Sequence, residues 1–77
     1  MTKARFHLTF PEHLIREPMV YRIGRDFDLV PNIRRANIEE TAAWMIMDLE
    51  GAEGDIARAI AWLEEGGVKV EQIEGSD

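Results

Sequence analysis

The sequence predicts an α+β domain in which a four-stranded antiparallel sheet carries two helices on one face. Three observations lead to this expectation. Polar and apolar residues alternate in some segments, apolar residues recur at helical spacing in two others, and glycine or polar residues separate the segments. Their order along the chain is strand, helix, strand, strand, helix, strand. The 77 residues are enough for one domain.

The first strand is expected over residues 3–10, KARFHLTF, where polar and apolar residues alternate strictly. The side chains expected on its covered face are Ala4, Phe6, Leu8 and Phe10, and those expected on its other face are Lys3, Arg5, His7 and Thr9. After a loop, the first helix is predicted over residues 18–27. Its apolar residues recur at helical spacing, and proline suits a first helical turn because its missing N–H would have no partner there.

The second strand, within VPNIRRANIEE at residues 30–40, breaks the alternation. Ile33 is out of phase with Ala36 and Ile38, so a regular strand could not place all three side chains on one face. One extra residue would restore the phase, because it shifts the alternation by one position. The sequence therefore predicts a β-bulge at Arg34 and Arg35.

The rest of the chain follows simpler patterns. After a polar turn at Glu39 and Glu40, TAAWMIMDLEG is predicted to be the third strand, and AEGDIARAIAWLEE an amphipathic helix that ends before Gly66 and Gly67. VKVEQI at residues 68–73 is predicted to be the last strand. The side chains expected in the core from these segments are Ala43, Met45, Met47, Leu49, Ile56, Ala59, Ile60, Leu63, Val68 and Val70.

This order of elements is typical of the ferredoxin-like split βαβ arrangement, with both helices on one face of the sheet. The other face is then left uncovered. The alternation places these residues on it: Arg5, His7, Trp44, Ile46 and Lys69. One domain is expected over residues 1–74, with a disordered tail at 75–77.

Composition excludes several classes of function. The net charge of −6 argues against nucleic-acid binding, which needs a positive surface. The chain has no cysteine and only two histidines, so we expect no metal site and no cofactor. It lacks the glycine-rich phosphate loops, and Ser76 in the tail is its only serine. No catalytic residues are predicted, and the protein is not expected to be an enzyme.

Hydropathy and the N-terminus indicate where the chain works. No apolar run approaches the ~20 residues of a membrane-spanning helix, so no direct membrane insertion is expected. The N-terminal residues alternate instead of forming an apolar signal sequence. A cytoplasmic location is therefore expected.

Trp44 and Ile46 are the candidate contact residues of the uncovered face. An apolar patch on an uncovered sheet is typical of an interface, and a core this small suits a chain that gains stability from a partner. The sequence predicts a homodimer through these two residues. Alternatively, a loop or the C-terminal tail covers them.

Three segments together resemble a known family. LTFP at residues 8–11, Asn-Ile at residues 32–33 and AIAWLEEGGVKVE at residues 59–71 resemble the NIL domain, and the resemblance covers nearly the whole chain. This ferredoxin-like module lies at the C-terminus of the ATPase subunit of bacterial methionine importers. Its name comes from an Asn-Ile-Leu run in the second strand, and here the run is Asn-Ile-Arg.

The resemblance implies a regulatory module that pairs with a second copy and binds methionine, or a similar amino acid, at or near the interface. It places ligand contact on Asn32, and we take its neighbours Ile33 and Arg34 as further candidates. Arg34 departs from the motif: a charge would oppose a thioether, although it could bind a carboxylate. Related modules are also fused to ferredoxin-type domains.

Two readings of the second strand stay open. Asn32 reads the polar end of an amino acid, or Pro31, Asn32 and the two arginines only shape a strand that resists wrong pairing. The corresponding functions are a small-molecule-sensing regulatory module and a protein-interaction adaptor. The adaptor would dock on a transport or ferredoxin-type redox partner and bind no small molecule.

Overall fold

One four-stranded antiparallel sheet, in the order β2-β3-β1-β4, forms the base of the fold. This computed structural model describes residues 1–74. The strands are β1 (Thr2–Phe10), β2 (Val30–Ile38), β3 (Ala43–Gly51) and β4 (Lys69–Ile73); the helices are α1 (Met19–Phe27), α2 (Glu53–Glu65) and the short 3₁₀ turn η1 (Glu12–Leu14). The predicted ferredoxin-like α+β fold is confirmed.

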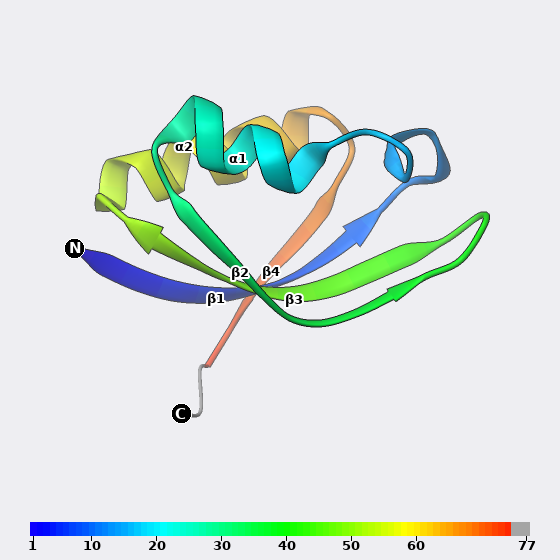
Figure 1. Cartoon of the computed structure of the whole chain (residues 1–77), viewed down its shortest axis with the longest axis horizontal. Coiled ribbons are helices and arrows are strands. Elements are labelled where there is room, and N and C mark those ends of the chain that lie inside the picture. The colour runs from blue at the N-terminus through cyan, green and yellow to red at the C-terminus, as the bar shows by residue number, and fades with distance from the viewer. Residues whose placement is uncertain (75–77) are drawn as a thin grey trace.

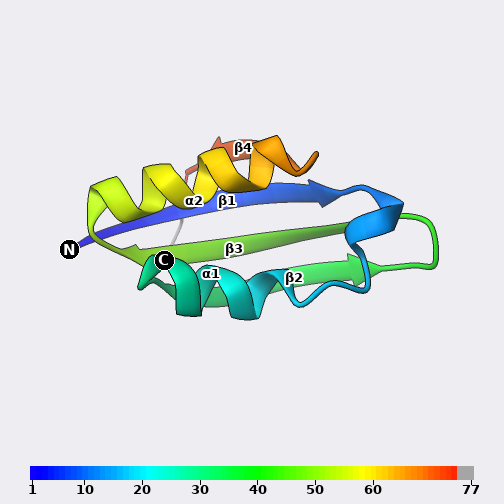
Figure 2. The ribbon, with the colours of Figure 1, turned by 90° about the horizontal axis from the view of Figure 1, so that it is seen from above.

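Both long helices lie on the same face of the sheet (Figures 1 and 2). Seen from above, α1 lies toward β2, and α2 lies toward β1 and β4. We call the opposite, helix-free side the open face of the sheet.

The core lies between the helices and the sheet, and it is built from the alternating positions of the strands. The buried apolar side chains are Phe6, Leu8, Phe10, Met19, Ile23, Leu29, Ala43, Met45, Met47, Leu49, Ile56, Ala59, Leu63 and Val68. Of the ten core residues expected from the segments after residue 40, eight belong to this cluster, and the other two, Ile60 and Val70, are partly buried and pack against it. Period-2 and period-3.6 patterning therefore predicted most of the core.

The predicted bulge in β2 is confirmed. Ile33 pairs with Met47, and Arg35 pairs with Ile46, so one extra residue, Arg34, stands between two consecutive partners on β3. This shift places Ile33 on the helix-covered face. It also brings Ala36 and Ile38 to that face, because they pair with the buried Met45 and Ala43.

Five predicted starts were wrong by one or two residues, including β1, which begins at Thr2 instead of residue 3, and α2, which begins at Glu53 instead of Ala52. The helix α1 begins at Met19, with Pro18 as its N-cap, and β3 begins at Ala43, because the Glu39 N–H donates to the Ala42 carbonyl in the turn. The last strand begins at Lys69 instead of Val68. The Val68 N–H donates to the Leu63 carbonyl at 3.0 Å and so helps to close the end of α2.

Within residues 1–74, no helix is long and apolar enough to cross a membrane. The tail predicted at residues 75–77 lies outside the described residues.

Candidate functional site

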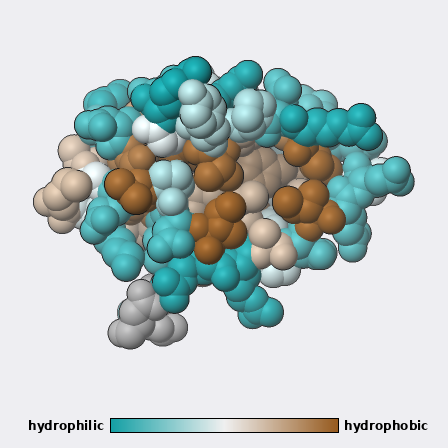
Figure 3. Space-filling model, in the orientation of Figure 1, coloured by the Kyte–Doolittle hydropathy of each residue, from teal (hydrophilic) through white to brown (hydrophobic). Residues whose placement is uncertain are grey.

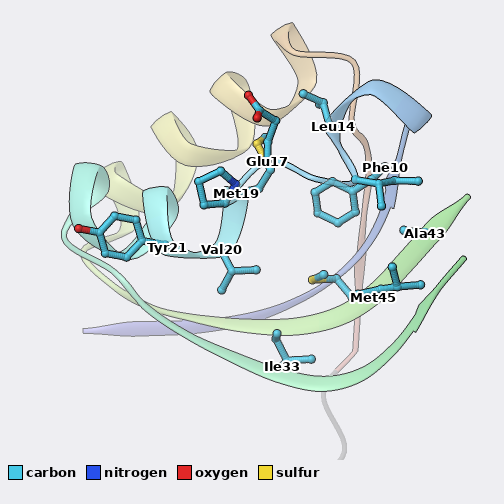
Figure 4. A pocket seen from close by; sticks show the side chains of 12 residues that line it. Phe10, Leu14, Glu17, Met19, Val20, Tyr21, Ile33, Ala43 and Met45 are labelled. Atoms are coloured by element: carbon cyan, nitrogen blue, oxygen red, sulfur yellow. The ribbon is translucent and has the colours of Figure 1, made fainter. Parts of the chain in front are cut away.

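An apolar groove lies between α1 and the β2 side of the sheet, on the helix-covered face. Its volume is about 230 Å³. The residues that line it come from β1, the loop before α1, α1, β2 and β3: Phe10, Leu14, Ile15, Glu17, Pro18, Met19, Val20, Tyr21, Ile33, Ile38, Ala43 and Met45. Figure 4 shows Val20, Ile33 and Met45 converging on it from α1, β2 and β3. We call this site the apolar groove.

The local sequence explains why the groove is open to one side. The strand β2 is an edge strand, and eight of its nine residues are exposed. The bulge nevertheless aims Ile33 and Ile38 at the helix side, where they remain 47% and 62% exposed. With Tyr21 on α1, also 62% exposed, they form an apolar rim. Figure 3 shows apolar side chains gathered on the surface between the helices and the sheet.

The lining of the groove offers few polar groups. Among the described residues that line it, Glu17 alone carries a formal charge, and Tyr21 alone contributes a side-chain hydroxyl. Such a site suits an apolar side chain whose polar end remains at the rim, since buried polar groups need partners. A cationic group could pair with Glu17 there.

The structure separates the three predicted ligand-binding residues. Ile33 lines the apolar groove. Asn32 pairs in register with Asp48, and Arg34 Nη1 lies 4.0 Å from Asp48 Oδ2, so both belong to the open face. Neighbours on a strand point to opposite sides, which is why Asn32 and Ile33 cannot line one groove in a single copy. Their roles in binding stay predictions.

The two predicted interface residues lie on the open face, where both are half-buried. The Trp44 ring stacks on His7, with 5.5 Å between the ring centroids and 16° between the planes. Ile46 pairs with His7 on β1 and Arg35 on β2. His7 Nδ1 is buried and has no hydrogen-bond partner within residues 1–74. The homodimer through Trp44 and Ile46 stays a prediction.

A buried ion pair is the centre of the open face, and sequence reasoning missed it. Arg5 donates twice to Asp48, from Nε to Oδ1 at 2.7 Å and from Nη2 to Oδ2 at 3.1 Å. The Asp48 side chain is 3% exposed. Hydrogen bonding from Arg5 lowers the pKa of Asp48, burial opposes that shift, and the charges of Arg5, Lys3 and Arg34 add to the lowering. Pairing β1 with β3 would have placed Arg5 opposite Asp48.

Sequence reasoning also missed most of the apolar groove. Leu14 and Ile15 lie in the segment that was predicted to be a loop, and η1 and the following turn bring them to the groove. Two apolar residues in a polar connection were the available signal. Within residues 1–74, no group of three or more histidine, aspartate or glutamate side chains is arranged to hold a metal ion.

Comparison with known proteins assigns the family. The profile of the NIL domain matches residues 4–72, nearly the whole chain. This chain belongs to the NIL domain family. The match extends over all four strands and both long helices.

The curated relatives of this NIL domain are larger proteins, and the chain matches only a part of each. The chain is 36% identical over 62 residues to the methionine import ATP-binding protein MetN 1 of Listeria innocua, a match that covers 75% of this chain and 18% of that protein. The MetN 1 protein of Listeria monocytogenes (strain F2365) is 34% identical over the same length. The match thus spans less than a fifth of these relatives.

Solved structures share the fold of this NIL domain. The C-terminal domain of an ABC transporter ATP-binding protein from Enterococcus faecalis superposes with a TM-score of 0.81 at 23% identity, covering 95% of this chain and 86% of that one. An uncharacterized DUF2179 protein from Eubacterium ventriosum has a TM-score of 0.58 at 10% identity, covering 95% and 100%. At these identities the likeness shows the fold alone.

Proposed function

We propose that this NIL domain is a non-enzymatic regulatory module that senses methionine, or a similar apolar amino acid, at a homodimer interface. The observation that carries the proposal is the apolar groove, in a chain whose relatives are named as methionine import proteins. The groove has an apolar floor and an open, apolar rim. It therefore suits a flexible, uncharged side chain such as a thioether.

The polar end of an amino acid needs partners at the rim of the groove. The Glu17 carboxylate can pair with the ammonium group of the ligand. Within residues 1–74, the groove lining of one copy offers no cation or side-chain amide for the ligand carboxylate. We propose that a second copy meets the β2 edge and supplies this contact through Asn32, the motif asparagine.

The apolar rim supports this placement of the homodimer. Tyr21, Ile33 and Ile38 expose apolar surface beside an edge strand, and covering it with a second copy would remove that surface from water. The ligand would then lie at the interface, and its binding would depend on pairing. A sensor of internal methionine acts in the cytoplasm, so the cytoplasmic location belongs to this proposal.

Ile33→Ala should weaken methionine binding about fivefold to tenfold, because it removes part of the apolar wall, worth roughly 1 kcal/mol for this half-exposed side chain. Ile46→Ala is the matched control, since Ile46 lies on the open face. Calorimetric titration of the intact chain measures both affinities. Equal affinities for Ile33→Ala and the wild type would contradict binding in the groove.

Sedimentation of two aspartate variants should identify the homodimer surface. Ile38→Asp places a charge on the apolar rim and should weaken dimerisation at least about tenfold, because a charge buried in an interface is costly. Ile46→Asp makes the same change on the open face, where the sequence predicts the interface. Monomers from Ile46→Asp alone would favour the open face, and a monomeric wild type at high micromolar concentration would contradict both surfaces.

A protein-interaction adaptor is the second candidate. Two consecutive arginines on the open face favour it. A transport protein or a ferredoxin-type redox protein would be its partner. If the wild type does not bind methionine, the adaptor function would be favoured over methionine sensing.

A further inference from the structure

The bulge in β2 does more than correct the phase of its apolar residues. Arg34 lies 4.0 Å from Asp48, and Arg35 pairs with Ile46, so both arginines reach the open face. In a regular strand, consecutive side chains would point to opposite faces. The bulge therefore turns Arg34 and Arg35 to the same side. We call these two residues the arginine pair.

The arginine pair borders a shallow hollow of about 380 Å³ on the open face. Ile46 and Ile73 contribute apolar side chains to the hollow, and Arg5 and Glu74 are its other lining residues. An apolar centre with arginines at its margin is typical of protein interfaces, where arginine and tryptophan contribute much of the binding energy. Trp44 lies two residues from Ile46 on the same face of β3.

The charge in this region is opposite to that of the whole chain. A second hollow adjoins the first, shares Arg5, Ile73 and Glu74 with it, and is also lined by Lys3 and Asp48. The two hollows together have four cationic lining residues, Lys3, Arg5, Arg34 and Arg35, and two anionic ones, Asp48 and Glu74. Positive side chains therefore outnumber negative ones around these hollows, although the whole chain has a net charge of −6. Asp48 is already held by two hydrogen bonds from Arg5, whereas Arg35 forms no ion pair within residues 1–74. The Arg34 side chain is 40% exposed.

We propose that the open face binds an acidic segment of a partner protein. The arginine pair binds its carboxylates, and Ile46 and Ile73 pack against an apolar side chain beside them. This surface lies on the opposite side of the sheet from the apolar groove, so the proposal stands independently of methionine sensing. Guanidinium groups bind carboxylates through two parallel hydrogen bonds, as Arg5 and Asp48 do within this face.

Other occupants fit the surface less well. Nucleic acid and anionic membranes select a larger positive surface, and the chain as a whole would be repelled by either. A second copy that met this face through two-fold symmetry would place one arginine pair close to the other, because such an interface uses the same patch twice. A protein segment that carries carboxylates beside an apolar side chain would complement both the positive charge and the apolar centre of this surface.

The test uses the intact chain and a fluorescent peptide in which glutamate and leucine alternate, with a glutamine–leucine peptide as its neutral match. We expect the acidic peptide to bind more tightly and to weaken with added salt. Arg34→Gln with Arg35→Gln should weaken its binding about tenfold or more, since each arginine contributes charge-assisted hydrogen bonds. Ile46→Ala should also weaken it.

The matched control is Arg22→Gln with Arg25→Gln on α1, which removes the same charge from another surface. It should leave peptide affinity unchanged. Equal losses in the two double variants would overturn the proposal, as would no binding of the acidic peptide at millimolar concentration. Tighter binding of DNA or anionic vesicles through the arginine pair would also overturn it. A change of oligomeric state in Arg34→Gln/Arg35→Gln would instead assign the face to a second copy.

Discussion

Asp48→Ala is expected to lower the free energy of unfolding by about 3–5 kcal/mol, a large part of the stability of a domain this small. The substitution leaves Arg5, whose side chain is only 10% exposed, without its carboxylate. Lys3 and Arg34 lie 4.0 Å from the same carboxylate and would lose it as well. Urea denaturation of the wild type and the variant measures the difference.

A double variant separates loss of the ion pair from loss of volume. Arg5→Met with Asp48→Leu replaces both partners with apolar side chains, and buried ion pairs replaced in this way often cost little. We expect the double variant to recover most of the stability that Asp48→Ala loses. If Asp48→Ala lowered the urea midpoint no more than a substitution at an exposed site does, the ion pair would not make the large contribution to stability that we predict.

The same ion pair predicts how stability depends on pH. The pKa of Asp48 is lowered in the folded state from its ordinary value of 3.8, chiefly by hydrogen bonding from Arg5. The carboxylate therefore stabilises the fold above that ordinary value, and its contribution is lost as the pH falls through the lower folded value. Asp48→Asn should show a weaker loss of stability below about pH 4. Asp26, whose pKa Arg25 lowers by hydrogen bonding, is present in both proteins.

The periodicity of the sequence was sufficient to predict the sheet, both long helices and the bulge. Each depends on which face apolar side chains occupy, and that property can be read along a single strand or helix. Residues 32–38 show it most clearly: the phase change between Ile33 and Ala36 required one extra residue, and the structure has it at Arg34.

The candidate sites were harder to predict because they join elements that are distant in sequence. The ion pair needs the register between β1 and β3, which brings Arg5 opposite Asp48 across 43 positions. The apolar groove needs Leu14 from the loop beside Ile33 from β2. Strand alternation shows the face on which a side chain lies, but not which neighbour stands beside it.

The structure also bears on the two readings of Asn32. If this residue were structural, its amide should satisfy nearby polar groups. Asn32 is exposed, and its side chain makes no hydrogen bond within residues 1–74. The amide therefore has no partner in the described fold, and both readings of Asn32 stay open to the test that follows.

Asn32→Leu is expected to weaken methionine binding tenfold to more than a hundredfold while the fold stays intact. A buried ligand group that loses its hydrogen-bond partner costs about 1–3 kcal/mol. Stability should hold or rise slightly, because leucine is the better strand residue and the amide has no partner to lose within the described chain. Calorimetric titration with methionine and melting curves measure the two effects.

Asn37→Leu is the matched control, because Asn37 is a second exposed asparagine on the open-face side of β2, paired with Trp44. It should bind methionine as the wild type does. Since Asn32 and the groove of its own copy lie on opposite faces of the sheet, a loss specific to Asn32→Leu would place the ligand where two copies meet at β2. A destabilised Asn32→Leu, together with no methionine binding by the wild type, would instead make Asn32 structural. The arginine pair would then remain as the functional feature of this strand.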